Sequence, residues 1–247
     1  KYNIDPVKRL LKIAKECGVK HCVVLGSYFS YFAKARPQMH LTEYHPYIRS
    51  RIDQEKVAMS FADDNFDVAV LELPYIFGTQ PGRKPVWVFL VESIRKMPGV
   101  TMWPKGGSTM VTVKQVGQAI AGAIERNKGG NCYPIGYYNL TWKEMLTICH
   151  KHLGCPNKKI ITIPDWMYGM AGKSLVKQQK KDGIQGGLDM IKFTELQCSN
   201  QFIDKELGSV PLGVEPDDID SAIGDSVKLC VDILDGKAKN IVAMKGE

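Results

Sequence analysis

Three side chains in the first quarter of the chain have types and a spacing that suit proton transfer. Ser27 follows an apolar run at residues 21–26, and Tyr47 and Arg51 stand four positions apart in a run with helical character. Four residues make about one helical turn, so Tyr47 and Arg51 are predicted to share one helix face. A fixed positive charge beside a phenol stabilises the phenolate, which allows a tyrosine to act as an acid or base. The serine hydroxyl can then hydrogen-bond a reacting hydroxyl or carbonyl group.

Each of the three residues also has an ordinary structural interpretation. Taken alone, the spacing favours a surface tyrosine, a serine at the end of a strand and an arginine without a chemical role. A serine hydrolase is excluded for Ser27, because a nucleophile elbow needs glycine two positions before and two positions after the serine. Those two positions hold Leu25 and Phe29.

Two buried strands must position these side chains. The apolar run at residues 22–25 predicts the first strand, and residues 67–73 predict the second, whose continuous apolar centre is typical of a strand covered on both faces. The aromatic pair Tyr28 and Phe29 follows the first strand. Aromatic clusters of this kind usually belong to the core, but open α/β sheets bind ligands at the carboxyl ends of their strands, so the alternative is that this pair lines a crevice.

The segment after the second strand is predicted to line the same crevice, since it also follows a carboxyl end. It contains Pro74, Tyr75 and Ile76. A loop further on carries Arg83, a cation that could meet a substrate phosphate.

The order of strands and helices predicts an α/β fold with a partial Rossmann-like parallel sheet flanked by helices. Thr141 and Glu144 form the capping-box pattern that begins a helix. Residues 33–46 are interpreted as a surface loop and residues 99–113 as a hairpin or irregular strand. Further helices are predicted at residues 47–61, 86–97, 116–126, 142–153, 164–176 and 216–234, and further strands at 132–135 and 160–163.

The composition is that of an ordinary globular protein with a mildly basic surface. The 247 residues carry a net charge of +7 and are 44% hydrophobic. The basic residues are scattered, so we expect no nucleic-acid binding, and no apolar run is long enough to span a membrane. Seven cysteines without a Cys-x-x-Cys pair indicate reduced thiols in the cytoplasm. The five histidines lack ligand spacing, so we expect no metal.

Together these motifs resemble a known family, the extended short-chain dehydrogenase/reductases or NAD-dependent epimerase/dehydratase group. The resemblance rests on Ser27, on Tyr-x-x-x-basic at 47–51, on the run at 71–78, and on helix starts at 112–116 and 140–145. It implies a cofactor, NAD or NADP, and a small-molecule substrate, either a nucleotide sugar or a smaller ketone or aldehyde. A monomer and a homodimer both stay open.

The resemblance also implies roles for the candidate residues. Tyr47 would be the acid/base, Ser27 would orient the reacting oxygen, and Arg51 would hold the cofactor ribose and assist the tyrosine. Cofactor contacts would come from Tyr47, Arg51 and the segment 74–76. Substrate contacts would come from Ser27, Tyr28, Phe29 and Arg83.

The chain departs from the family pattern at two features. Arg51 stands where the family has lysine, and the glycine-rich phosphate loop is not in this sequence. The arginine keeps a second hypothesis open, a weak or inactive NAD(P)-binding or sensing protein. The missing loop leads us to expect the C-terminal part of a longer protein, with residues 1–78 and 108–136 in the cofactor-binding domain. A smaller, mostly helical substrate domain would comprise residues 79–107 and 137–247.

Overall fold

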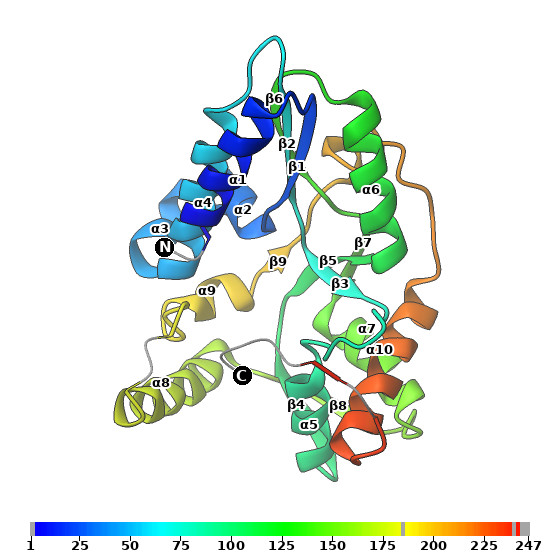
Figure 1. Cartoon of the computed structure of the whole chain (residues 1–247). Coiled ribbons are helices and arrows are strands. Elements are labelled where there is room, and N and C mark those ends of the chain that lie inside the picture. Colours follow the sequence, from blue (N-terminus) through cyan, green and yellow to red (C-terminus); the bar gives the residue numbers. More distant parts are fainter. Residues whose placement is uncertain (1–2, 184–185, 239–240, 243–247) are drawn as a thin grey trace.

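A parallel sheet flanked by helices forms the upper half of the molecule in Figure 1. The computed structural model describes residues 3–183, 186–238 and 241–242. The sheet has the strand order β1-β2-β6, and both neighbouring pairs run parallel. Its strands are β1 (His21–Leu25), β2 (Asp67–Glu72) and β6 (Gly130–Pro134).

Helices cover both faces of this sheet, which explains the apolar character of its central strand. Figure 1 shows α1, α2 and α4 on one face and α6 on the other. Residues 68–72 of β2 are all buried, as the continuous apolar run predicts. The helices are α1 (Asp5–Glu16), α2 (Tyr28–Ala35), α4 (Pro46–Met59) and α6 (Val113–Arg126).

Two smaller sheets extend the fold below the first. In the second sheet β5 pairs in parallel with β3 and β9 and antiparallel with β7, and in the third β4 pairs in parallel with β8. The strands are β3 (Tyr75–Phe77), β4 (Val100–Pro104), β5 (Gly107–Thr112), β7 (Tyr138–Thr141), β8 (Lys159–Ile163) and β9 (Asn200–Gln201).

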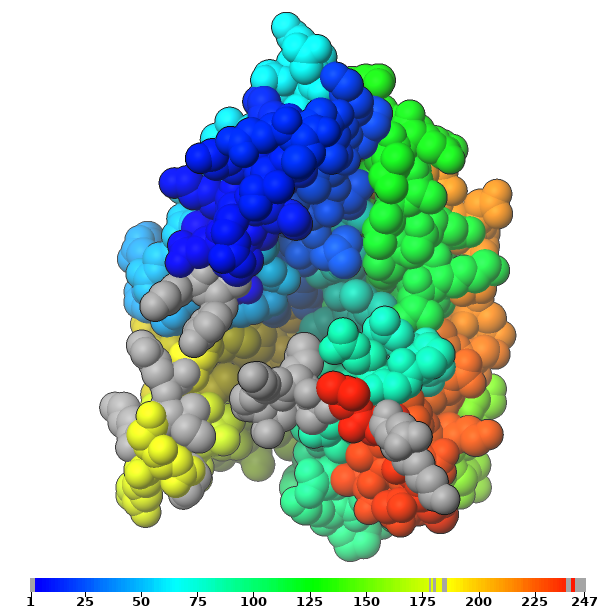
Figure 2. All heavy atoms as spheres, in the orientation of Figure 1, coloured from blue at the N-terminus to red at the C-terminus, as the bar shows by residue number. Residues whose placement is uncertain are grey.

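The lower half of the molecule is mainly helical, and α10 packs against both α5 and α7. In Figure 2 the teal loop after β3 lies below the green α6 and above the orange-red α10. Within the described residues, no helix combines the length and apolarity that crossing a membrane requires. The helices are α3 (Leu41–Tyr44), α5 (Val88–Lys96), α7 (Trp142–His152), α8 (Asp165–Lys181), α9 (Phe193–Gln197) and α10 (Ile219–Leu234).

A side-chain cap begins α7 at the predicted point, and another begins α6 at Val113, three residues before the predicted range. The Thr141 hydroxyl accepts from the Glu144 N–H at 3.2 Å, and the Glu144 carboxylate accepts from the Thr141 N–H at 2.8 Å, so the predicted capping box of α7 is confirmed. Thr112 and Gln115 form a second capping box at α6. Both boxes satisfy backbone N–H groups that the first turn of a helix leaves without partners.

Two of the predicted segments differ from the structure, although strands do occupy most of residues 99–113. Residues 99–113 are not a hairpin, because β4 and β5 join different sheets with partners far along the chain. Residues 33–46 are not simply a surface loop: they contain the end of α2, a 3-10 turn at Pro37–Met39 and α3. Met39 and Leu41 are buried there, because the segment packs between α2 and α4.

Candidate active site

The carboxyl end of β1 holds Ser27 against the sheet. The preceding Gly26 donates its N–H to the Leu71 carbonyl of β2 at 2.8 Å, and a Cβ at this glycine would come within 2.8 Å of Val70 Cγ1. Ser27 is buried and caps α2, since its hydroxyl accepts from the Phe29 N–H at 3.4 Å. Ser27 therefore has a structural contact as well as a position where open α/β sheets bind ligands.

Helix α4 brings Tyr47 and Arg51 together, as their four-residue spacing predicts. The guanidinium carbon of Arg51 lies 5.6 Å from the centroid of the Tyr47 ring, which is within cation–π range. Pro46 begins the helix, and the Tyr47 N–H, which has no partner inside the first turn, donates to the Gly187 carbonyl at 2.8 Å. Helix geometry and this external contact together fix the tyrosine.

The Arg51 guanidinium connects α4 to the end of β1. Its Nη1 donates to Gln54 Oε1 at 2.9 Å, and its Nη2 approaches the Gly26 carbonyl at 3.4 Å. Its Nε is buried and has no hydrogen-bond partner among the described residues. The positive charge is thus held between the helix and the sheet, next to Tyr47.

A pocket of about 520 Å³ opens where β1 and β2 end. It brings Ser27, Tyr47 and Arg51 together with the segments that follow both strands, although these segments lie far apart in the sequence. The crevice predicted from the strand ends is therefore present, and the chemical roles of its residues stay predictions. Its walls consist of Leu25, Gly26, Ser27, Tyr28, Phe29, Tyr47, Arg51, Leu73, Pro74, Tyr75, Ile76, Val86, Trp87 and Phe89.

Tyr28 lines the pocket, but its hydroxyl belongs to a buried hydrogen-bond network. The hydroxyl donates to Gln201 Oε1 at 2.8 Å and lies 3.0 Å from Ser108 Oγ. Burial, with the neighbouring Tyr75, raises the pKa of Tyr28 well above its ordinary value. Tyr28 is therefore a neutral group that joins α2 to β5 and β9, with its ring in the pocket wall.

Tyr75 lies in an aromatic cluster at the inner end of the pocket. Its ring centroid is 5.0 Å from that of Trp87, 5.6 Å from that of Trp142 and 6.0 Å from that of Tyr28. Burial also raises the pKa of the Tyr75 hydroxyl. Aromatic pairs at these separations add to the stability of a packed wall, so this side of the pocket is apolar and ordered.

Arg83 is not among the described residues that line this pocket. It is exposed in the loop at residues 79–85, and its backbone forms an isolated bridge with Val242. The predicted contact between Arg83 and a substrate phosphate is therefore without support from the position of the residue.

The aromatic residues Trp87 and Phe89 line the pocket and were not identified as site residues from the sequence. The pattern assigned Trp87 to the apolar face of a helix, and Trp87 does stack on Phe77 with ring centroids 4.4 Å apart. Phe89 is 55% exposed, and its side chain lines the pocket. The helix pattern alone could not show that this turn of α5 faces the strand ends.

An ionic cluster lies beside the site, on α2, α4 and β2. Lys34 Nζ is 2.6 Å from Glu55 Oε1 and 3.1 Å from Glu72 Oε1. Burial raises the pKa of Glu72 to about 7, against the opposing charge of Lys34. The Lys34–Glu72 approach lacks hydrogen-bond geometry, since Glu72 Oε1 has no hydrogen-bond partner among the described residues. One lysine therefore compensates two carboxyl groups incompletely.

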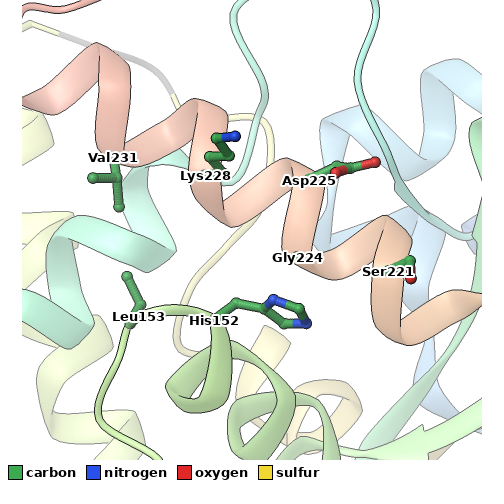
Figure 3. A pocket seen from close by; sticks show the side chains of 7 residues that line it. All are labelled: His152, Leu153, Ser221, Gly224, Asp225, Lys228 and Val231. Atoms are coloured by element: carbon green, nitrogen blue, oxygen red, sulfur yellow. The ribbon is translucent and has the colours of Figure 1, made fainter.

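A second hollow, of about 370 Å³, lies between the end of α7 and α10. Figure 3 shows the His152 ring below Gly224, where the glycine leaves room for it. His152 Nε2 lies 2.9 Å from Asp220 Oδ1, and Lys151 Nζ lies 2.8 Å from the same oxygen. These contacts join the two helices, so we assign the hollow a structural role. Its walls are His152, Leu153, Ser221, Gly224, Asp225, Lys228 and Val231.

Within the described residues, no three or more His, Cys, Asp and Glu side chains gather in a group that could hold a metal ion. The thiol of Cys132, which lies on β6, has a pKa raised to about 12 by burial and the nearby Glu55. A thiol with this pKa is protonated near neutral pH, so it is a poor nucleophile and a poor metal ligand.

Comparison with known proteins finds similar structures and no similar sequence. Neither a protein-family model nor a curated protein matches the sequence at a significant level. The structure called gox2253 superposes with a TM-score of 0.70 at 15% identity, covering 96% of this chain and 73% of that chain. UDP-N-acetylglucosamine 4-epimerase from Methanobrevibacter ruminantium M1, in complex with UDP-N-acetylmuramic acid, superposes with a TM-score of 0.60 at 16% identity. The match covers 94% of this chain and 69% of that chain.

A third structure, the enzyme WbmG from Bordetella bronchiseptica in complex with NAD and UDP, superposes with a TM-score of 0.63 at 12% identity. It covers 98% of this chain and 68% of that chain. The chain therefore has the α/β fold of the NAD-dependent epimerases and dehydratases. This confirms the predicted fold class and, at the level of fold, the resemblance noted in the sequence.

Proposed function

We propose that this chain carries the active site of an NAD(P)-dependent oxidoreductase of the epimerase/dehydratase type, acting on a hydroxyl or carbonyl compound. The observation that carries the proposal is the pocket at the ends of β1 and β2, whose walls include Ser27, Tyr47 and Arg51. A serine, a tyrosine and a fixed cation in one crevice are the groups that a proton relay needs.

The residues in this pocket fit a nicotinamide cofactor. Gly26 keeps the end of β1 free of a side chain, and the buried Arg51 Nε is a donor without a described partner. The structurally similar WbmG holds NAD. Tyr47, Arg51 and residues 74–76 would hold the nicotinamide and its ribose. When bound, the reduced nicotinamide supplies a hydride to the carbonyl carbon.

The chain's own residues would move the proton. As the carbonyl carbon gains the hydride, the electron pair of the C=O π bond forms a new O–H bond with the proton of the Tyr47 hydroxyl. The carbonyl becomes an alcohol, and the tyrosine is left as phenolate until solvent reprotonates it. Arg51 stabilises that phenolate as a neighbouring cation, and Ser27 hydrogen-bonds the reacting oxygen. Oxidation of an alcohol runs through the same steps in reverse.

A second candidate function is a cofactor-binding or sensing protein with little turnover. The observation that favours it is the engagement of Arg51 by Gln54 Oε1 and the Gly26 carbonyl, which draws the guanidinium toward the sheet. A planar guanidinium held by two other groups is less suited to stabilising a phenolate than a compact ammonium group.

Steady-state kinetics of the full-length protein separates the two functions. NADH or NADPH is offered with a panel of ketones, aldehydes and nucleotide sugars, and cofactor oxidation is followed by absorbance. The enzyme hypothesis expects substrate-dependent oxidation that falls at least about 100-fold in Tyr47→Phe, because the phenylalanine keeps the ring and removes the proton. Tight cofactor binding without turnover across the panel would establish the sensing function instead.

The matched control is Tyr44→Phe, which removes an exposed tyrosine hydroxyl from α3, one element before α4. Turnover by this variant is expected to equal that of the wild type. Equal losses in Tyr44→Phe and Tyr47→Phe would contradict the assignment of Tyr47 as the proton donor.

The predicted division of the chain stays part of this proposal. Residues 79–107 were assigned to the substrate domain, and Val86, Trp87 and Phe89 from that stretch form one wall of the pocket. Ser27 and Arg51, from the cofactor-binding part, also line the pocket. A crevice lined by both parts supports a site between a cofactor domain and a substrate domain.

A further inference from the structure

A second cavity, of about 270 Å³, adjoins the pocket of Ser27 and Tyr47. The two share four wall residues, Phe29, Tyr75, Trp87 and Phe89. The shared side chains place the two spaces next to each other. We call this second space the aromatic cavity.

Aromatic and aliphatic side chains form most of the remaining wall of the aromatic cavity, together with Gln197. Trp103, Trp142, Tyr168, Phe193 and Met190 contribute to it, from elements spread over half of the chain. No Asp, Glu, Lys or Arg is among the described residues that line it. The cavity therefore offers stacking and apolar contacts, and it offers no charge to balance a charged ligand.

Several polar atoms in this wall are engaged or held neutral, whereas Trp103 Nε1 is buried and has no hydrogen-bond partner among the described residues. Trp142 Nε1 donates to the Gln197 carbonyl at 2.9 Å, and Trp87 Nε1 donates to the Ile76 carbonyl at 2.8 Å. Burial raises the pKa of the Tyr168 hydroxyl to about 12, so it stays protonated at neutral pH. The contacts of Trp142 and Trp87 turn these two indole N–H groups toward the protein backbone and leave their ring surfaces to a ligand.

The diphosphate group of a nucleotide sugar does not fit this surface. Its phosphate charges need cations, which in proteins are usually arginine or lysine. Arg51 is the cation in the adjoining pocket, and it is the residue that would hold the cofactor. Arg83, the cation predicted to meet a substrate phosphate, is not among the described residues that line either space.

We propose that the substrate is an uncharged aromatic ketone or aldehyde, or the corresponding alcohol, with one or two rings in the aromatic cavity and its oxygen beside Tyr47. This inference deepens the proposed function and rests on it for the chemistry at Tyr47. The volume of about 270 Å³ lies just below the range of about 300–1,000 Å³ that holds drug-sized ligands, which favours a small ring system.

The direct test is calorimetric titration of the full-length protein with benzylacetone, an uncharged phenyl ketone, with and without oxidised cofactor. UDP-glucose and glyceraldehyde are titrated in parallel. We expect benzylacetone to bind at least about 10-fold more tightly than glyceraldehyde, because its ring buries apolar surface. We expect UDP-glucose not to compete with it. Tighter binding of UDP-glucose, displacing benzylacetone, would overturn the proposal.

A charge placed in the aromatic cavity tests the location. Met190→Glu is expected to weaken benzylacetone binding at least about 10-fold, because the carboxylate must be desolvated by the ligand. The matched control is Met170→Glu, since Met170 is 59% exposed on α8 and is not among the described residues of the cavity wall. Equal affinities in both variants would overturn the location.

A second variant keeps the test usable if Met190→Glu fails to fold, as judged by circular dichroism. Phe89→Ala removes a ring that is 55% exposed and shared by both spaces, so its loss leaves the core packed. It is expected to weaken benzylacetone binding about 2- to 10-fold through the lost ring contact. An unchanged affinity in this variant would count against the aromatic cavity.

Failure of this inference can be told apart from failure of the proposed function. Binding of benzylacetone that Met190→Glu weakens, without any turnover, would support the aromatic cavity and refute the enzyme. Tyr47-dependent conversion of UDP-glucose or glyceraldehyde, without benzylacetone binding, would support the enzyme and refute the aromatic substrate.

Discussion

Replacing Glu72 with glutamine should stabilise the protein in alkaline solution. Glu72 is 1% exposed at the end of β2 and competes with Glu55 for the single cation of Lys34. Its pKa in the folded protein is about 7, against an ordinary value of 4.5. The carboxylate form is thus the form that the fold disfavours.

The direction of the pH effect follows from these two values. Between about pH 4.5 and about pH 7 the folded state binds the Glu72 proton more tightly than the unfolded state, so folding stability falls as the pH rises. The difference between the folded and the ordinary pKa of Glu72, at about 1.4 kcal/mol per pKa unit, corresponds to a loss of folding stability of about 3 kcal/mol. This loss is complete above about pH 7. Because the Lys34 side chain is 45% exposed and can readjust, we expect the actual loss of folding stability to be about 1–3 kcal/mol.

Urea unfolding followed by circular dichroism measures this difference. At about pH 8, Glu72→Gln should exceed the wild type by about 1–3 kcal/mol in the free energy of unfolding, and at about pH 5 the two should differ by less than about 1 kcal/mol. The control Glu206→Gln changes an exposed glutamate and should follow the wild type at both pH values. A Glu72→Gln variant that is less stable than the wild type at about pH 8 would refute the reasoning, since the buried carboxylate would then be well compensated.

Three further predictions concern the site and its supports. Arg51→Lys, which offers a compact charge to the tyrosine, should raise turnover at least ~2-fold in steady-state kinetics, and unchanged turnover would show that the arginine is no handicap. Gly26→Ala should lower the free energy of unfolding by about 1–3 kcal/mol in urea, because its Cβ would come 2.8 Å from Val70 Cγ1; an unchanged value would show that the strand end can move. Thr112→Val removes the cap of α6 and the hydroxyl that donates to Asp217 at 2.7 Å, so the free energy of unfolding should fall by about 1–2 kcal/mol in thermal unfolding. A variant as stable as the wild type would show that the cap does not stabilise the protein.

Local patterns predicted those elements whose signals are local. The capping box at Thr141 and Glu144 fixed the start of α7, and the continuous apolar run of β2 indicated a strand covered on both faces. The spacing of Tyr47 and Arg51 likewise predicted their contact, because a single helical turn determines it. In each case the deciding interaction lies within a few residues of the pattern.

Features that depend on partners far along the chain could not be predicted from the sequence. The strand β4 pairs with β8, which comes more than fifty residues later, so nothing near Gly106 could show that β4 and β5 would separate. The same limit applies to Phe89, whose position in the pocket wall depends on how α5 packs beside the strand ends. Met39 and Leu41, predicted in a loop, are buried in a cluster that includes Phe193, about 150 residues further along the chain.

Transfer of an isotope from cofactor to substrate is the sharpest test of the chemistry assigned to this pocket. The full-length protein is incubated with reduced cofactor, dideuterated at the nicotinamide C4 position, and with benzylacetone, and the alcohol is analysed by mass spectrometry. We predict deuterium on the carbinol carbon with the wild type, and a yield at least about 100-fold lower with Tyr47→Phe. Equal deuterium transfer by wild type and Tyr47→Phe would contradict the role of Tyr47 as the proton donor beside a bound dinucleotide.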